Sequence, residues 1–217
     1  MKSKEMRYIY LALFILITAT VSAQDDYPDY RSKKELFTRL QEKDIRNDLA
    51  TFTMGGIEES VGKDSLHTIP IVAFGKDFMT WEAENMQVTL KTAPFDPTKH
   101  KFTYYDPEKT YLLKIDNKPY FGNYGTVPKT VVEKVTVILG RDTIVVPPAA
   151  CTDLANPVLT FNEKGKAKSQ NKVFLSKDGR KIYVYMLKPE AGGSYEATWV
   201  IQDRKYFKRI VDFGFLR

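Results

Sequence analysis

Alternation of apolar and polar residues with a period of two is the feature that most restricts how this chain can fold. It begins near residue 69 and continues to the C-terminal region. In the stretch YEATWVIQ one set of alternate positions is apolar: Tyr195, Ala197, Trp199 and Ile201. Because successive side chains of a β-strand point to opposite faces, this pattern predicts an antiparallel sheet with one buried face and one wet face.

Turn residues divide this region into hairpins. The stretch VEKVTVILGRDTIVVP has two β-branched runs around Gly140, and VFLSKDGRKIYVYML repeats the design around Asp178-Gly179. YEATWVIQDRKYFKRIVDF makes a third hairpin, and PPAACTDLANP at 147–157 is suited to a crossover between two sheets. With about ten strands expected and no alternation of strands with helices, we predict an all-β fold, a two-sheet antiparallel β-sandwich.

One helix is expected before the strands begin. Ser32 and Glu35 have the spacing of a capping box, in which each side chain bonds a backbone N–H at the start of a helix. The apolar pattern that follows predicts a helix over 32–53, with a break near Asp44 and an end at Gly55-Gly56. We expect this N-terminal helix to pack on the sandwich.

The first residues have the composition of an export signal. Basic residues precede an apolar run over 8–20, and small residues precede Gln24. The run is shorter than the roughly 20 residues that a membrane-spanning helix needs. We therefore predict a cleaved signal peptide at 1–23, a helical segment at 24–56 and a β-sandwich domain at 57–217. The protein would be exported to the periplasm or beyond, as in a bacterial envelope, with no membrane span after cleavage.

Charge and cysteine content argue against several functions. The formal net charge is +6, with no block of five or more basic residues, which does not favour nucleic acid as a partner. Cys151 is the only cysteine, so neither an intrachain disulfide nor a thiolate metal cluster can form. His67 and His100 lie outside any metal-ligand motif. We expect no metal site and no cofactor.

The loop KPYFGNYGTVPK at 118–129 is the strongest candidate for a binding site. It carries Tyr120, Phe121 and Tyr124 on a segment that two glycines allow to fold back tightly. Aromatic faces on a loop suit a sugar ring or a peptide side chain, and Trp81 could contribute to the same site. The same rings could instead plug the end of the sandwich. A second aromatic pair, Tyr183 and Tyr185, is either a binding platform or a second buried face of its strand.

Glu82 and Glu84 are weak catalytic candidates. On one strand their carboxylates would lie on the same face, about 7 Å apart. Paired carboxylates beside Trp81 resemble the arrangement that a glycosidase requires. A Glu-x-Glu pair is more often part of a solvated strand face or a turn.

Three hypotheses for function follow. The first is an exported, non-enzymatic binding or envelope-accessory protein that recognises a glycan or a protein partner through its loop aromatics. The second is a hydrolase acting on polysaccharide through Glu82 and Glu84. The third is a structural or assembly subunit that pairs with a partner strand through an exposed sheet edge.

Overall fold

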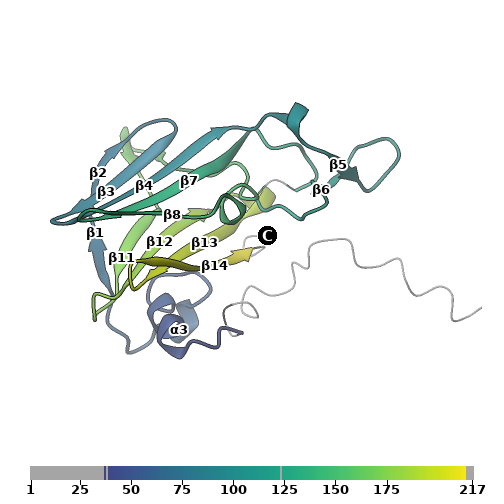
Figure 1. Cartoon of the computed structure of the whole chain (residues 1–217). Helices are drawn as coiled ribbons and strands as arrows, with labels where there is room; N and C mark the ends of the chain where they lie inside the picture. Colours follow the sequence, from purple (N-terminus) through teal and green to yellow (C-terminus); the bar gives the residue numbers. More distant parts are fainter. Residues whose placement is uncertain (1–36, 38, 123, 214–217) are drawn as a thin grey trace, which may run out of the picture.

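The computed structural model describes residues 37, 39–122 and 124–213. Within them the chain is mostly β, with antiparallel sheets and one short α-helix, α3 (Lys43–Leu49) (Figure 1). This confirms the antiparallel, mostly β class. The predicted signal peptide at 1–23 and the capping box at 32–35 lie outside the described residues.

Two five-stranded sheets form stacked layers (Figure 1). The inner sheet has the order β1 (His67–Ile69), β11 (Lys172–Leu175), β12 (Lys181–Lys188), β13 (Tyr195–Gln202) and β14 (Lys205–Phe213). The outer sheet has the order β2 (Ile71–Phe74), β3 (Phe78–Ala83), β4 (Met86–Pro94), β7 (Thr130–Leu139) and β8 (Asp142–Val145). Two small sheets pair β5 (Phe102–Tyr104) with β6 (Leu112–Ile115) and β9 (Phe161–Glu163) with β10 (Lys166–Lys168).

A single extended stretch supplies one edge of both sheets. β1 pairs with β11 in the inner sheet, and β2 pairs with β3 in the outer sheet. Only Pro70 separates β1 from β2. Proline has no N–H to donate to a ladder, which suits a point where the strand leaves one sheet for the other. The Pro70 carbonyl still accepts a hydrogen bond from Glu82 N at 3.1 Å, so the crossing is tied to β3.

The hydrophobic core lies between the two sheets. Trp81 of β3 and Trp199 of β13 are fully buried in it, and the Trp199 indole donates to the Ala150 carbonyl at 2.6 Å. Met86, Val88 and Leu90 alternate along β4 toward the same core, as the period of two predicted. Burial of each large side chain of this kind contributes about 1.5–3 kcal/mol, so this layer supplies much of the driving force for folding.

The inner sheet has a second cover on its opposite face. α3 lies beneath that sheet in Figure 1, and its Ile45 and Leu49 are buried against Tyr183 and Tyr185 of β12. All eight residues of β12 are buried as a result. The prediction that β13 has one wet face was therefore wrong, since seven of its eight residues are buried.

The predicted helix is interrupted and ends early. Residues 39–42 are not helical, α3 runs over Lys43–Leu49, and turns replace it from Ala50 onward; residues 32–36 and 38 of the predicted helix lie outside the described part of the chain. The hydroxyls of Thr51 and Thr53 bond back to the carbonyls of Asp48 and Leu49 at 2.7 and 2.9 Å. Such local bonds compete with a regular helix and help to end it.

A buried carboxylate fixes the segment after the helix to the inner sheet. Glu196 of β13 accepts hydrogen bonds from Met54 N at 2.7 Å, from Gly55 N at 2.6 Å and from the Tyr185 hydroxyl at 2.8 Å. Its side chain is almost fully buried, with 2% exposure. A buried carboxyl group is tolerated when its oxygens accept several hydrogen bonds, and here these bonds join the helical layer to the sheet.

The three predicted hairpins are confirmed. They join β7 to β8, β11 to β12, and β13 to β14. The segment 147–157 does lie between an outer-sheet strand, β8, and the strands that lead into the inner sheet.

Glu196→Ala should lower the free energy of unfolding by about 3 kcal/mol, because two backbone N–H groups and the Tyr185 hydroxyl lose their acceptor in a buried site. Chemical denaturation measures the change. Glu133→Ala, at an exposed position of β7, is the matched control and should change stability by less than about 0.5 kcal/mol. Equal stability of the two variants would contradict the role given to Glu196.

Candidate functional site

One end of the sandwich is closed by the aromatic loop 118–129. β13 begins there at Tyr195, which is paired with Phe213 at the end of β14. Gly122 lies so close to this end that a Cβ would come within 2.3 Å of the Ala155 carbonyl oxygen and 2.4 Å of the Tyr195 ring. Its φ of +100° also favours glycine. The loop is thus seated directly on the core.

Tyr120 is part of a small hydrophobic cluster. It is 6% exposed and packs with Leu112 and Ala155. Its hydroxyl donates to the Thr126 carbonyl at 3.1 Å. Burial raises the pKa of Tyr120 above its usual value. The ring is therefore held inside the loop rather than presented to solvent.

Phe121 and Tyr124 are half-buried. The backbone of Phe121 donates to the Asp153 carbonyl at 2.8 Å and accepts from Ala155 N at 2.7 Å, while its ring packs on Phe213 at 5.2 Å between centroids. Burial raises the pKa of Tyr124 to about 12. These contacts match the plug interpretation of the loop.

Trp81 does not lie with the loop aromatics. It is fully buried in the core between the sheets, on the inward face of β3. Its ring has no surface on which a ligand could stack.

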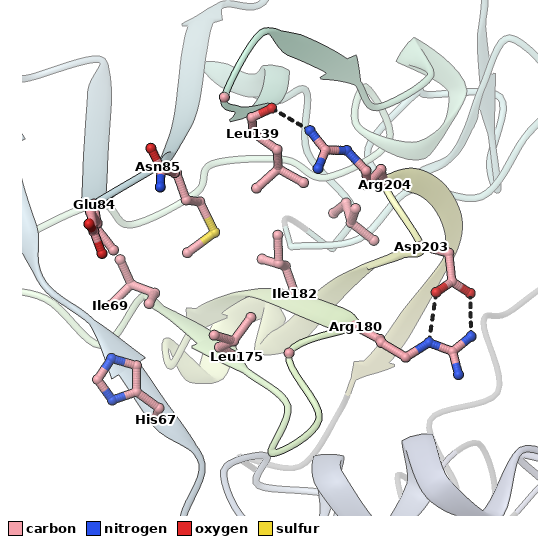
Figure 2. A pocket seen from close by; sticks show the side chains of 15 residues that line it. His67, Ile69, Glu84, Asn85, Leu139, Leu175, Arg180, Ile182, Asp203 and Arg204 are labelled. Atoms are coloured by element: carbon pink, nitrogen blue, oxygen red, sulfur yellow. Dashed lines mark hydrogen bonds and ion pairs between the residues drawn. The ribbon is translucent and has the colours of Figure 1, made fainter.

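The opposite end of the sandwich is open. A pocket of about 820 Å³ lies between the ends of the two sheets (Figure 2). Its floor is aliphatic and draws on both sheets: Ile69, Met86, Leu139, Leu175, Ile182 and Ile201. This floor is the edge of the main core itself: Ile69, Met86, Ile182 and Ile201 are buried, and Leu139 and Leu175 are half-buried.

The rim consists of hairpin turns that are tied together within each sheet. Gly140 N, in the β7–β8 turn, donates to the Asn85 carbonyl in the β3–β4 turn at 2.8 Å. Asp203 N, in the β13–β14 turn, donates to the Arg180 carbonyl in the β11–β12 turn at 3.0 Å. Each sheet therefore presents a fixed pair of turns to the pocket.

Arg204 connects the two sheets across this end. Its Nε donates to Asp142 at 2.8 Å and its Nη2 to the Leu139 carbonyl at 2.7 Å. Arg180 forms a two-point pair with Asp203, at 2.8 and 2.9 Å. Figure 2 shows Arg180, Asp203 and Arg204 on one side of the pocket, with Glu84 and His67 on the other.

The β13–β14 turn has an unfavourable choice of residues for its backbone shape. Asp203 and Arg204 both have positive φ, +50° and +62°, which a two-residue hairpin turn of this hand requires. Asn-Gly is the usual sequence there, because other residues are strained at positive φ. The side chains at these positions make the rim contacts described above, so the turn keeps charged groups at the pocket despite the strain.

The electrostatics of the rim are balanced. The hydrogen bond from Arg180 lowers the pKa of Asp203 below its ordinary value, and this pair is one of two oppositely charged pairs on the rim. Arg204 and Asp142 form the second such pair. The opening therefore carries both signs of charge around an apolar floor.

Glu82 and Glu84 do not share a cleft. Glu82 lies on the solvent face of β3, where the Gln87 amide donates to it at 3.4 Å. Glu84 lies on the β3–β4 turn and lines the pocket. The strand geometry that would put both carboxylates on one face ends at Ala83.

Cys151 is buried, and this burial raises the pKa of its thiol to about 11. Across the described residues no group of three or more His, Cys, Asp or Glu is placed to hold a metal ion. No helix in that part of the chain has the length and apolar character to cross a membrane.

Comparison with protein-family models, with curated proteins and with solved structures finds no significant match.

Sequence reasoning missed the open end. Its floor is formed by inward-facing apolar strand residues, which the sequence pattern does not distinguish from ordinary core residues. Its rim is formed by turns. The one available signal was Asp203-Arg204 at a two-residue turn where Asn-Gly would be expected.

Tyr120→Ala should lower the free energy of unfolding by about 3 kcal/mol, because it leaves a cavity in the cluster that seats the loop. Tyr105→Ala is the control, since that ring is 65% exposed, and it should cost less than about 0.5 kcal/mol. Thermal or chemical denaturation measures both. A Tyr120→Ala variant as stable as the control would show that the loop is not a plug.

Proposed function

We propose that the protein is an exported, non-enzymatic binding or envelope-accessory module that takes a small apolar or amphipathic molecule at the open end of its sandwich. The observation that carries the proposal is the aliphatic pocket of about 820 Å³ at that end. Its size falls in the range of roughly 300–1,000 Å³ that is common for small-molecule sites. Export rests on the sequence of residues 1–23.

The chemistry of the lining favours an apolar ligand over a glycan. Six aliphatic or thioether side chains form the floor, and no Trp, Tyr or Phe lines the pocket. Glycan sites use flat aromatic faces and many hydrogen-bonding groups, and the loop aromatics proposed for that role are buried or half-buried. An aliphatic ligand would displace water from the floor, which is favourable by about 25 cal/mol for each Å² covered.

The rim suits a polar head group on such a ligand. Arg180 and Arg204 use only some of their donors on Asp203, Asp142 and Leu139, because a guanidinium has five N–H groups. Glu84 and His67 make no side-chain hydrogen bond or ion pair with any described residue. A ligand with an aliphatic tail and a polar head would satisfy both layers of the site.

Ala83→Trp tests the pocket by filling it. Ala83 is half-buried and lines the pocket, so an indole there should weaken binding of the apolar fluorescent probe N-phenyl-1-naphthylamine by roughly tenfold or more. Ala93→Trp, half-buried on β4 away from the pocket, is the matched control and should leave probe binding unchanged. Displacement of the probe by dodecanoate then reports the amphipathic ligand. If the wild-type protein does not bind the probe, or both variants bind it equally, the proposed site is refuted.

Replacing the β13–β14 turn with Asn-Gly distinguishes the effect of its charged side chains on ligand binding from their effect on the stability of the fold. Asp203→Asn with Arg204→Gly removes both charged contacts but relieves the strain of positive φ, so the free energy of unfolding should change by less than about 1 kcal/mol. Dodecanoate should bind more weakly, while the uncharged probe should bind as before. Equal losses for both ligands would assign the turn a purely structural role.

A further inference from the structure

The edge of the outer sheet exposes an apolar strand. β2 is the terminal strand of that sheet, and Ile71, Val72 and Phe74 are 40%, 53% and 50% exposed. Ile71 and Phe74 are paired with Trp81 and Met79 and lie on the core-facing side of the sheet. Ala73, paired with Thr80, lies on the other side. The edge thus presents apolar groups along its whole length, which soluble proteins ordinarily avoid.

A cationic hairpin emerges beside this edge. The hydroxyl of Ser169, just after β10, donates to the sulfur of Met79 at 3.5 Å, and Met79 is the partner of Phe74. In Figure 1 the β9–β10 hairpin is the green ribbon at the end of the structure where β2 and β3 are labelled, and the Ser169–Met79 contact joins its base to β3. All residues of 161–168 are exposed, and within the described chain the two strands pair only with each other.

The charge of this hairpin and its base is strongly one-sided. Residues 161–172 contain four lysines and one glutamate, a formal charge of +3. Glu163 is paired with Lys168, while Lys164, Lys166 and Lys172 form no ion pair with any described residue. Phe161, 37% exposed, is the strand partner of Lys168, so an apolar ring and cationic groups share one face of the ribbon.

We propose that the β2 edge and the β9–β10 hairpin together form a docking surface for an anionic lipid bilayer. The apolar residues of β2 would enter the interface between head groups and acyl chains, and the lysines would lie on the phosphates. Attraction of lysines to an anionic surface acts over about 10 Å in ordinary salt, which a projecting hairpin can reach. This surface is distinct from the pocket, and the proposal does not depend on it.

A bilayer fits the edge better than a partner strand does. Val72 is an extra residue opposite β3, where the register shifts between Ile71 and Ala73. A bulge in an edge strand and a proline directly before it both disrupt the ladder that an added strand would need. A partner strand would also leave the side chains on both faces of β2 in water, whereas a membrane interface covers them.

A tryptophan reporter in the edge tests the proposal directly. Val72→Trp in the full chain should shift its emission to shorter wavelength, and be quenched by brominated lipid, on vesicles of phosphatidylcholine and phosphatidylglycerol in equal parts. Val145→Trp is the matched control, because Val145 is 47% exposed on β8 at the opposite edge of the same sheet. The apolar run at 8–20 would attach either variant to lipid, so the signal is the difference between the two reporters.

Charge variants in the reporter background complete the test. Lys164→Glu with Lys166→Glu should weaken the response of the Val72→Trp reporter by roughly tenfold or more, because cationic groups become anionic at the surface. Lys118→Glu with Lys129→Glu makes the same change in net charge on the plug loop and should have little effect. Vesicles of phosphatidylcholine alone should give a weaker response.

Three outcomes would overturn the proposal. The two reporters could respond alike, or the response could be the same on neutral and anionic vesicles. The Val72→Trp emission could instead shift without lipid as protein concentration rises, which would show that the edge pairs with a second copy of the chain. Circular dichroism and thermal unfolding of every variant confirm that each remains folded.

Discussion

Burial of the inner sheet on both faces is the constraint on which the rest of the structure depends. β12 has no solvent-facing side, so the chain must supply two separate covers for it. The outer sheet covers one face through the tryptophan-centred core, and the helical layer covers the other through Ile45 and Leu49. Glu196 holds the second cover in place by accepting hydrogen bonds from the backbone at Met54 and Gly55. Short as α3 is, it is required for a sheet whose tyrosines would otherwise face water.

Two stacked sheets still have open ends, and this protein treats its two ends differently. At the end where β13 begins, the loop 118–129 places Tyr120 and Phe121 over the core and closes it. At the other end hairpin turns rise around the core without covering it, and Arg204 joins the two sheets at one side. The aliphatic floor of that pocket is formed by buried and half-buried side chains at the edge of the core, and an apolar ligand placed there would remove the remaining aliphatic surface from water. The aromatics that look like a ligand site in the sequence close one end, and the proposed site is the pocket at the opposite end.

The sequence was sufficient where structure is determined locally. Turn residues such as Asp178-Gly179 and alternation along each strand predicted the hairpins and the antiparallel class. Features that depend on contacts between distant segments were not accessible. The need for glycine at position 122 comes from the close approach of Ala155 and Tyr195, which are distant in the sequence. The pocket floor likewise combines strands from both sheets. The second buried face of β12 did leave a trace, since the unbroken apolar run IYVYML is typical of a strand covered on both sides. The helix was predicted to run through Thr51 and Thr53 because the apolar pattern continues there. In the structure the hydroxyls of these residues bond to the preceding turn.

The crossing at Pro70 relates the two proposed surfaces to each other. His67 and Ile69 of β1 line the pocket, and the exposed edge begins at Ile71, on the other side of the proline. An extended stretch from His67 to Phe74 spans only about 23 Å, at roughly 3.3 Å for each residue. A bilayer in contact with β2 would therefore lie close to the mouth of an aliphatic pocket. The ligand chemistry inferred from the pocket and the surface chemistry inferred from the edge are of the same kind, yet they rest on different residues and are tested by different variants. Either proposal can therefore fail without the other.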